Sequence, residues 1–127
     1  MKICFKKGIL GFDECKNFEL VDIDEESIFK LLKSQEEKEF QLVVVSPFDI
    51  EEDYEVDIPD GVTKELNIKS HEDVLILTTV TVNSDPKKIT TNLRAPIIIN
   101  LKNNNAEQII LSSEKYKIKH PIMKERN

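Results

Sequence analysis

The apolar residues of this chain are gathered in short runs of strand length, each bounded by glycine, proline, asparagine, aspartate or serine. Branched and aromatic side chains are common in these runs, as is typical of β-strands. We expect seven or eight strands, with candidates at residues 2–5, 17–21, 27–32, 40–45, 54–58, 74–82, 95–101 and 108–111. Their close spacing, without a long helical period between them, favours antiparallel connections in a barrel or sandwich over a wound α/β sheet. The predicted fold class is all-β, as a small antiparallel β-barrel-like domain.

Two short helical segments interrupt the strand pattern. A helix is predicted at residues 60–67, because Asp60 can cap the amides of a first turn and Val62 and Leu66 repeat on one face. A second helical turn is expected to begin at residues 85–86, where aspartate precedes proline. The fold is therefore predicted to carry one or two short helices.

A run of three asparagines at residues 103–105 lies between two apolar segments. Asparagine tolerates the left-handed backbone of a tight hairpin, so strands 95–101 and 108–111 are expected to pair. The length of 127 residues suits a single domain. We predict one domain over residues 1–121 and a charged tail over residues 122–127.

The two halves of the chain carry charges of opposite sign. Residues 1–60 hold 17 acidic and 7 basic residues, whereas residues 61–127 hold 7 acidic and 11 basic ones. An acidic body repels phosphates, so direct binding of nucleic acid is not expected and a basic protein partner fits better. The 3 glycines cannot supply a phosphate-binding loop.

The cysteines and histidines indicate neither a metal site nor a catalytic pair. Cys4, Cys15, His71 and His120 are scattered, whereas a structural zinc site draws its ligands in close pairs. The two cysteines without a C-x-x-C motif indicate a reduced, cytoplasmic protein, and the apolar runs are too short for a membrane helix. No cofactor, metal or membrane association is expected.

Six patterns lie in order along the chain, each ordinary as a strand or turn when taken alone. They are G-I-L-G-F at 8–12 with K-N-F at 16–18, L-V-V-V-S-P-F at 42–48, Y-E-V-D-I-P at 54–59, D-V-L-I-L with V-T-V at 73–77 and 80–82, T-T-N-L-R-A-P-I-I-I-N at 90–100, and Y-x-x-x-H-P at 116–121. In this order and spacing they resemble the FliW family of flagellar assembly factors. Leu10 stands where that family usually has proline.

The resemblance implies a function as well as a fold. FliW proteins are small cytosolic β-barrel-like monomers without enzymatic activity. They bind CsrA, a basic RNA-binding dimer, and also flagellin, so that free flagellin releases CsrA to repress flagellin translation. The acidic half of the chain agrees with a basic partner. The alternative is a barrel that binds a small ligand in its mouth, or an enzyme of unknown chemistry.

Two groups of residues are candidates for partner binding. The acidic segment, defined as Asp49, Glu51, Glu52, Asp53 and Glu55, carries no basic residue and is expected to meet CsrA. A solubilising loop is the alternative explanation for such a run. Asn92 and Asn100 flank the apolar run around Pro96, and their amides can either bond the backbone there or contact a partner.

Overall fold

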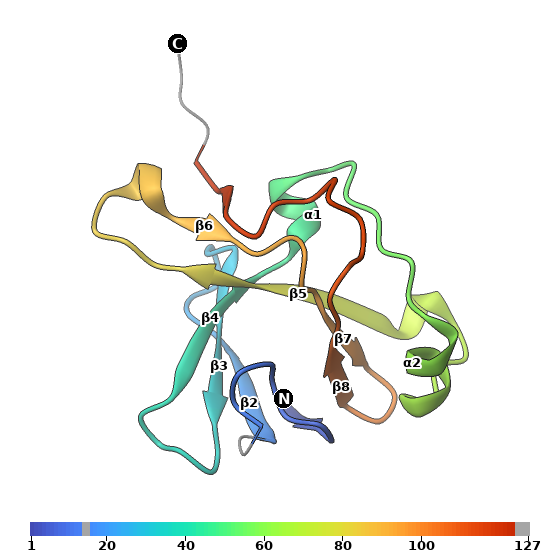
Figure 1. Ribbon diagram of the computed structural model, residues 1–127. Coiled ribbons are helices and arrows are strands. Elements are labelled where there is room, and N and C mark those ends of the chain that lie inside the picture. The colour runs from blue at the N-terminus through green and yellow to red at the C-terminus, as the bar shows by residue number, and fades with distance from the viewer. Residues whose placement is uncertain (14–15, 124–127) are drawn as a thin grey trace.

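The computed structural model describes residues 1–13 and 16–123, and within them the chain forms a small barrel with short helices outside it (Figure 1). Seven strands close the barrel in the order β4-β3-β2-β1-β8-β7-β5, and β5 pairs back to β4. The strands are β1 (Lys2–Phe5), β2 (Asn17–Asp22), β3 (Phe29–Ser34), β4 (Gln41–Val45), β5 (Val74–Thr81), β6 (Thr90–Thr91), β7 (Ile97–Asn100), β8 (Asn105–Gln108) and β9 (His120–Pro121). The helices are α1 (Pro47–Ile50), α2 (Asp60–Glu65) and the 3-10 turns η1 (His71–Asp73) and η2 (Pro86–Lys88). The predicted all-β barrel class is confirmed.

The barrel core is built from alternate residues of the strands, as the period of two requires. Phe5 and Phe18, on the neighbouring strands β1 and β2, are fully buried and meet edge to face with ring centroids 5.4 Å apart. Branched aliphatic side chains fill the remaining space around them, including Leu32, Val44, Ile97 and Ile99. A core of this kind needs no metal or disulfide to close it.

Strand β5 is shared between two neighbours along its length. Its first half pairs with β7 up to Leu77↔Ile97, and its second half pairs with β6 from Val80↔Thr91. Between these two points, two residues of β5 face the five residues 92–96 of the returning chain. The extra residues cannot stay in the ladder, so segment 92–96 leaves it as a bulge. We call this segment the 92–96 bulge.

A second, smaller core fixes this bulge to the rest of the chain. Leu93 is buried between Tyr54 and Tyr116, whose ring centroids lie 4.6 Å apart. The Tyr54 hydroxyl donates to the Leu93 carbonyl oxygen at 2.6 Å, and the Tyr116 hydroxyl accepts from the Glu55 N–H at 2.8 Å. Burial, with a smaller contribution from Tyr116, raises the pKa of Tyr54 well above its ordinary value, so the hydroxyl remains a donor.

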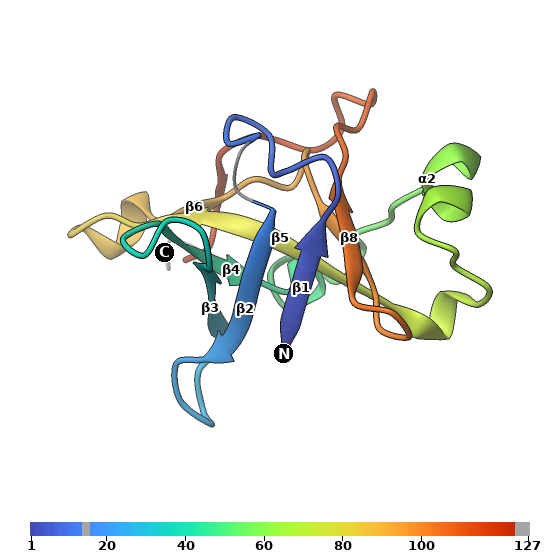
Figure 2. The same ribbon diagram turned by 90° about the horizontal axis from the view of Figure 1, so that it is seen from below.

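Helix α2 lies beside β7 and β8 on the outside of the barrel (Figure 2). Val62 and Leu66 point inward and pack on Ile98 and Ile109, as their i, i+4 spacing predicts. The buried amide of Asn100 donates from Nδ2 to the carbonyl oxygens of Leu66 at 2.8 Å and of Asn67 at 3.2 Å. These carbonyls end the helix and lack an intrahelical donor, so Asn100 holds α2 on the barrel.

Two predicted turns are confirmed. The asparagine run forms the turn between β7 and β8, with Asn104 in the left-handed region at φ 59° and its N–H donating to the Asn100 carbonyl at 2.7 Å. The turn at 85–86 opens η2, where the Asp85 side chain accepts from the Lys87 N–H at 3.0 Å.

Other expectations were wrong. Residues 54–58 do not form a strand, because Tyr54 enters the small core and Val56 and Ile58 pack toward α2 instead of joining the sheet. The last barrel strand is β8 at 105–108 rather than 108–111. Beyond this strand, the N–H groups of Ile109 and Leu111 donate to the Pro96 and Arg94 carbonyls, which continues the β7–β8 register although these residues are outside the strands.

The connections and caps also differ in part from the prediction. Strands β1 and β8 run parallel, with Cys4 opposite Asn105, while the other pairings among the described strands are antiparallel as expected. Asp60 does not cap α2. Pro59 occupies the N-cap position and Asp60 begins the helix, where its charge still suits the helix dipole.

Candidate functional site

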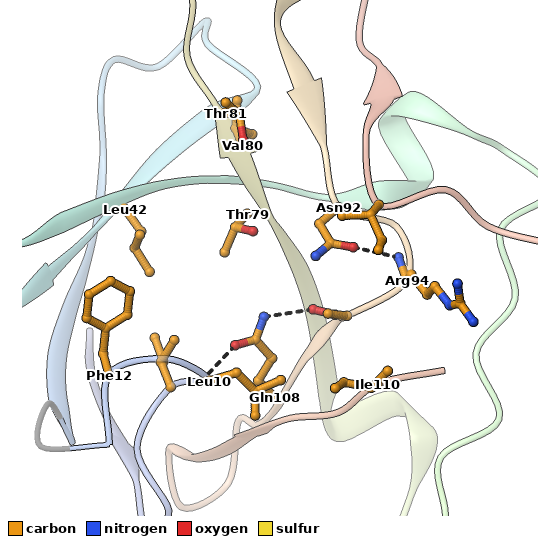
Figure 3. A pocket seen from close by; sticks show the side chains of 13 residues that line it. Leu10, Phe12, Leu42, Thr79, Val80, Thr81, Asn92, Arg94, Gln108 and Ile110 are labelled. Atoms are coloured by element: carbon orange, nitrogen blue, oxygen red, sulfur yellow. Dashed lines mark hydrogen bonds between the residues drawn. The ribbon is translucent and has the colours of Figure 1, made fainter. Parts of the chain in front are cut away.

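An open groove of about 450 Å³ lies at one end of the barrel (Figure 3). It is formed by the loop that follows β1, the ends of β4 and β5, the 92–96 bulge and the segment between β8 and β9. The lining residues are Ile9, Leu10, Phe12, Leu42, Thr79, Val80, Thr81, Asn92, Arg94, Ala95, Gln108, Ile110 and Ile118. We call this depression the mouth groove. Segments far apart in the sequence therefore meet at one surface.

Divergence of two barrel strands opens the groove. The pairing of β4 with β5 runs from Val45↔Thr78 to Val43↔Val80 and then stops. Leu42 and Thr81, which would form the next pair, line the groove instead. The barrel is thus closed in its middle and splayed at this end.

Gln108 ties two walls of the groove together. Its Oε1 accepts from the Leu10 N–H at 3.2 Å, and its Nε2 donates to the Ala95 carbonyl oxygen at 3.0 Å. The two bonds run in opposite directions from one amide, as Figure 3 shows. A single side chain at the end of β8 therefore sets the distance between the N-terminal loop and the 92–96 bulge. The sequence gives no sign of this role, because both partners are backbone atoms of distant segments.

The loop that follows β1, which forms one wall of the groove, contains two glycines with positive φ. Gly8 has φ +72° and Gly11 has φ +87°, a region that side-chain-bearing residues rarely adopt. A Cβ on Gly8 would lie 2.7 Å from the Asp13 Cα, so the backbone also approaches closely there. This turn directs the exposed Leu10 and Phe12 side chains to the groove, where Phe12 packs on Phe40 with ring centroids 4.3 Å apart.

Salt bridges anchor the same loop on its other side. Lys7 Nζ lies 2.8 Å from Glu65 Oε2 in α2 and 3.4 Å from Glu107 Oε1 in β8. The hydrogen bond to Glu65 and the charge of Glu107 raise the pKa of Lys7. Lys7 and Glu65 face water, whereas the Glu107 side chain is 14% exposed, so the contact with Glu65 positions the loop more than it stabilises the fold.

Asn92 shapes the 92–96 bulge at the groove. Its Oδ1 accepts from the Arg94 N–H at 3.0 Å, which is the local bond that asparagine often makes in turns. Its Nδ2 faces the groove (Figure 3). Asn100, by contrast, is 1% exposed and its amide is occupied by the end of α2, so the two asparagines of the sequence pattern lie in different environments.

The acidic segment lies away from the mouth groove. It begins in α1 and continues through the turn that leads to Tyr54, with Glu51 half-buried and the other four carboxylates exposed. Glu51 and Asp53 line a second depression of about 420 Å³, together with Lys115 and Lys117. The three salt bridges among the described residues involve none of these side chains. The segment is thus available to a partner, with basic residues beside it.

The described residues, 1–13 and 16–123, include no group of three His, Cys, Asp or Glu side chains placed to hold a metal ion. Cys4 is a half-buried free thiol, and Cys15 lies outside the described residues. No helix in this part of the chain is long and apolar enough to cross a membrane.

The comparison with known proteins decides the family. The family described as FliW protein matches residues 1–122. The chain belongs to the FliW family. Its FliW relatives include the flagellar assembly factor FliW of Clostridium botulinum (strain Alaska E43 / Type E3), which is 56% identical over 124 residues, covering 98% of this chain and 88% of the relative.

Further FliW comparisons agree in sequence and in structure. The flagellar assembly factor FliW of Clostridium tetani (strain Massachusetts / E88) is 54% identical over 125 residues, covering 98% of this chain and 86% of the relative. A crystal structure of the flagellar assembly factor FliW superposes with a TM-score of 0.92 at 33% identity, covering 99% of this chain and 88% of that one. Five of the segments that first indicated FliW contribute residues to the mouth groove, namely 8–12, 42–48, 80–82, 90–100 and 116–121, whereas 16–18, 54–59 and 73–77 do not.

Proposed function

We propose that this protein is a non-enzymatic flagellar assembly factor that binds the RNA-binding regulator CsrA and also flagellin. Free flagellin binds the protein and so releases CsrA, which then represses flagellin translation. Membership of the FliW family over residues 1–122 is the observation that carries the proposal. The protein would act in the cytoplasm as a monomer, without a cofactor and without binding RNA itself.

The distribution of charge supports a basic partner. The protein has a formal net charge of -6, and the acidic segment presents four exposed carboxylates beside Tyr54. A local negative field of this kind attracts a basic protein and orients it during the encounter. Exposed ion pairs contribute about 0.2 to 1 kcal/mol each, so the segment would act mainly on the association rate.

The proposal is tested by a competition titration with purified proteins. A partner switch requires that flagellin lowers the affinity for CsrA and, because the coupling is reciprocal, that CsrA lowers the affinity for flagellin by the same factor. We expect saturating flagellin to weaken CsrA binding at least about tenfold, within the usual range of coupling free energies. Calorimetric titrations that give the same CsrA affinity with and without flagellin would contradict the switch.

Charge reversal tests whether CsrA binds at the acidic segment. Replacing Glu51, Glu52 and Asp53 together by lysine is expected to slow CsrA association about tenfold at low ionic strength and to flatten its salt dependence. The melting temperature should hardly change, because the three side chains leave the barrel core untouched. Stopped-flow association at several salt concentrations measures the effect.

A matched variant distinguishes an effect of the acidic segment from an effect of the total charge of the protein. Glu25, Glu26 and Glu39 are exposed acids on other turns, and their replacement by lysine changes the net charge by the same amount. This control should lose much less of the association rate. Equal slowing by both triple variants would show that only the total charge matters and that the acidic segment is a solubilising loop.

A further inference from the structure

We propose that the mouth groove is a docking site for an amphipathic α-helix of a partner protein, whose apolar stripe fills the groove and whose flank carries carboxylates. The proposal goes beyond the function given above, because it follows from the groove itself and not from the identity of any partner. It predicts the secondary structure and the charge of what binds there.

The groove is an exposed apolar surface rather than an enclosed pocket. Its rim side chains are unusually open for their type, with Leu10 45%, Phe12 47%, Ile110 69% and Ile118 58% exposed. A small ligand normally loses most of its surface to its site, which this open arrangement does not allow. Contiguous apolar side chains at a surface instead mark contacts with other proteins.

The backbone around the groove offers few hydrogen bonds to a guest. The N–H groups of Leu10, Phe12, Asn92, Ile109 and Leu111 already donate within the chain. On β4, only Gln41 and Leu42 lie beyond the pairing with β5, which is too short an edge to pair with a strand of ordinary length.

A guest segment must therefore satisfy its own backbone groups. An α-helix does so internally, whereas an extended peptide would leave its N–H and C=O groups unpaired against an apolar wall. Helix-in-groove recognition uses apolar anchors at i, i+3 or i+4 and i+7 on the guest. The mouth groove fits this mode and not β-strand addition.

The positive charge at the rim of the groove indicates that the bound partner helix carries acidic residues. Arg94 is the charged residue among those that line the groove, although the protein as a whole is acidic. Its Nε donates to the Leu111 carbonyl oxygen at 3.3 Å, which holds the side chain beside Leu111, and Figure 3 shows the guanidinium at the outer rim, pointing away from the centre of the groove. No salt bridge among the described residues involves Arg94.

A second basic element adds to this rim. Ile118 lies in the groove and is followed by the exposed Lys119, whereas Lys117 lines the second depression with Glu51 and Asp53. The rim is therefore cationic on the side of the 92–96 bulge and the C-terminal segment. A helix with aspartate or glutamate next to its apolar stripe is the complementary partner, and a basic helix is not.

The test is selection from a library of displayed random peptides of 16 residues, each roughly 24 Å long as a helix. Selection is carried out on the full chain and, in parallel, on the Ile110→Asp variant. We expect the full chain to enrich peptides with apolar residues at i, i+3 or i+4 and i+7 and with flanking Asp or Glu. The Ile110→Asp protein should not enrich them, because it places a carboxylate in the apolar wall.

Binding of the best synthetic peptide is then measured by fluorescence anisotropy. Ile110→Asp and, independently, Ile118→Asp should weaken it at least about tenfold, and Arg94→Gln should weaken it roughly threefold to tenfold, as expected for a rim charge. Leu101→Asp is the matched control, since Leu101 is an exposed leucine in the turn at 101–104, away from the groove residues, and should bind like the unchanged protein. The bound peptide should show a helical circular dichroism spectrum.

Several outcomes would overturn the proposal. They are enrichment of extended or proline-rich motifs, enrichment of basic peptides, or enrichment that is no greater on the full chain than on Ile110→Asp. Sedimentation that shows a dimer of the unchanged chain, lost in Ile110→Asp, would assign the groove to a second copy instead. Because the selection contains neither CsrA nor flagellin, its failure leaves the competition titration unaffected, and failure of that titration leaves the selection unaffected.

Discussion

Replacing Asn100 by aspartate is expected to lower the free energy of unfolding by about 3 to 5 kcal/mol, the range for leaving an uncompensated charge in a buried site. The Asn100 Nδ2 group donates to two carbonyl oxygens at the end of α2, and the side chain is 1% exposed. Aspartate has nearly the same shape but puts a carboxylate against those oxygens. Urea unfolding followed by circular dichroism at neutral pH measures the loss.

Two further measurements make this prediction specific. Asn103 also donates to the Leu66 carbonyl oxygen, at 3.0 Å, but it is exposed, so Asn103→Asp should cost less than about 1 kcal/mol. The introduced carboxyl at position 100 is neutralised in acid, so the stability gap between that variant and the unchanged protein should narrow as the pH falls toward 4. Equal losses for the two variants, or a gap that widens in acid, would contradict the role given to Asn100.

Replacing Gly8 by alanine is expected to cost about 2 to 4 kcal/mol, the sum of left-handed strain and overpacking. At φ +72° the new Cβ would meet the Asp13 backbone at 2.7 Å, and a backbone atom cannot turn aside as a side chain can. The loop must therefore move, and Leu10 and Phe12 move with it. Denaturant unfolding measures the stability of the variant.

Gly11→Ala is the matched control for this prediction. Gly11 also has a positive φ, at +87°, but nothing lies within 4 Å of its added Cβ. It should cost only the strain, about 1 to 2 kcal/mol. If the two alanine variants prove equally stable, the close approach at Gly8 does not contribute. The Leu10 N–H bond to Gln108 provides a second readout, since hydrogen exchange at the Leu10 N–H should be faster in Gly8→Ala than in the unchanged protein.

Strands β1 to β5 and β7 and their approximate limits could be predicted from sequence because burial in this barrel follows the period of two. Strand β1, for example, buries Ile3 and Phe5 and exposes Lys2. The turn chemistry at Asn104 and Asp85 was equally readable, since each acts within a few residues of itself. Patterns that act over a few residues can therefore be interpreted without knowledge of the fold.

The remaining features depend on partners distant in the chain. The parallel pairing of β1 with β8 and the bulge opposite β5 follow from barrel closure, which no local pattern encodes. Glu36 illustrates the same limit on a smaller scale: its carboxylate accepts the N–H groups of Lys16 and Asn17, although a run of two glutamates in sequence suggests only a solvated surface.

The candidate site was predictable only in part for the same reason. Acidic composition identified a surface that the structure leaves open, but the sequence did not indicate that Lys115 and Lys117 lie beside it. The mouth groove was missed altogether, because Leu10, Ile110 and Ile118 read as ordinary apolar residues until the fold brings them together.

The parallel pairing of β1 with β8 also determines how late in the synthesis of the chain the barrel can close. Cys4 pairs with Asn105, so the first strand cannot gain its second neighbour until the ribosome has made about 100 more residues. At roughly 5 to 20 residues per second, that interval lasts about 5 to 20 s. During it the outer edge of β1 is unpaired, and such an edge can pair with other chains. Nascent copies on one messenger RNA are therefore exposed to one another until the barrel closes, and slow elongation before residue 105 would lengthen that exposure.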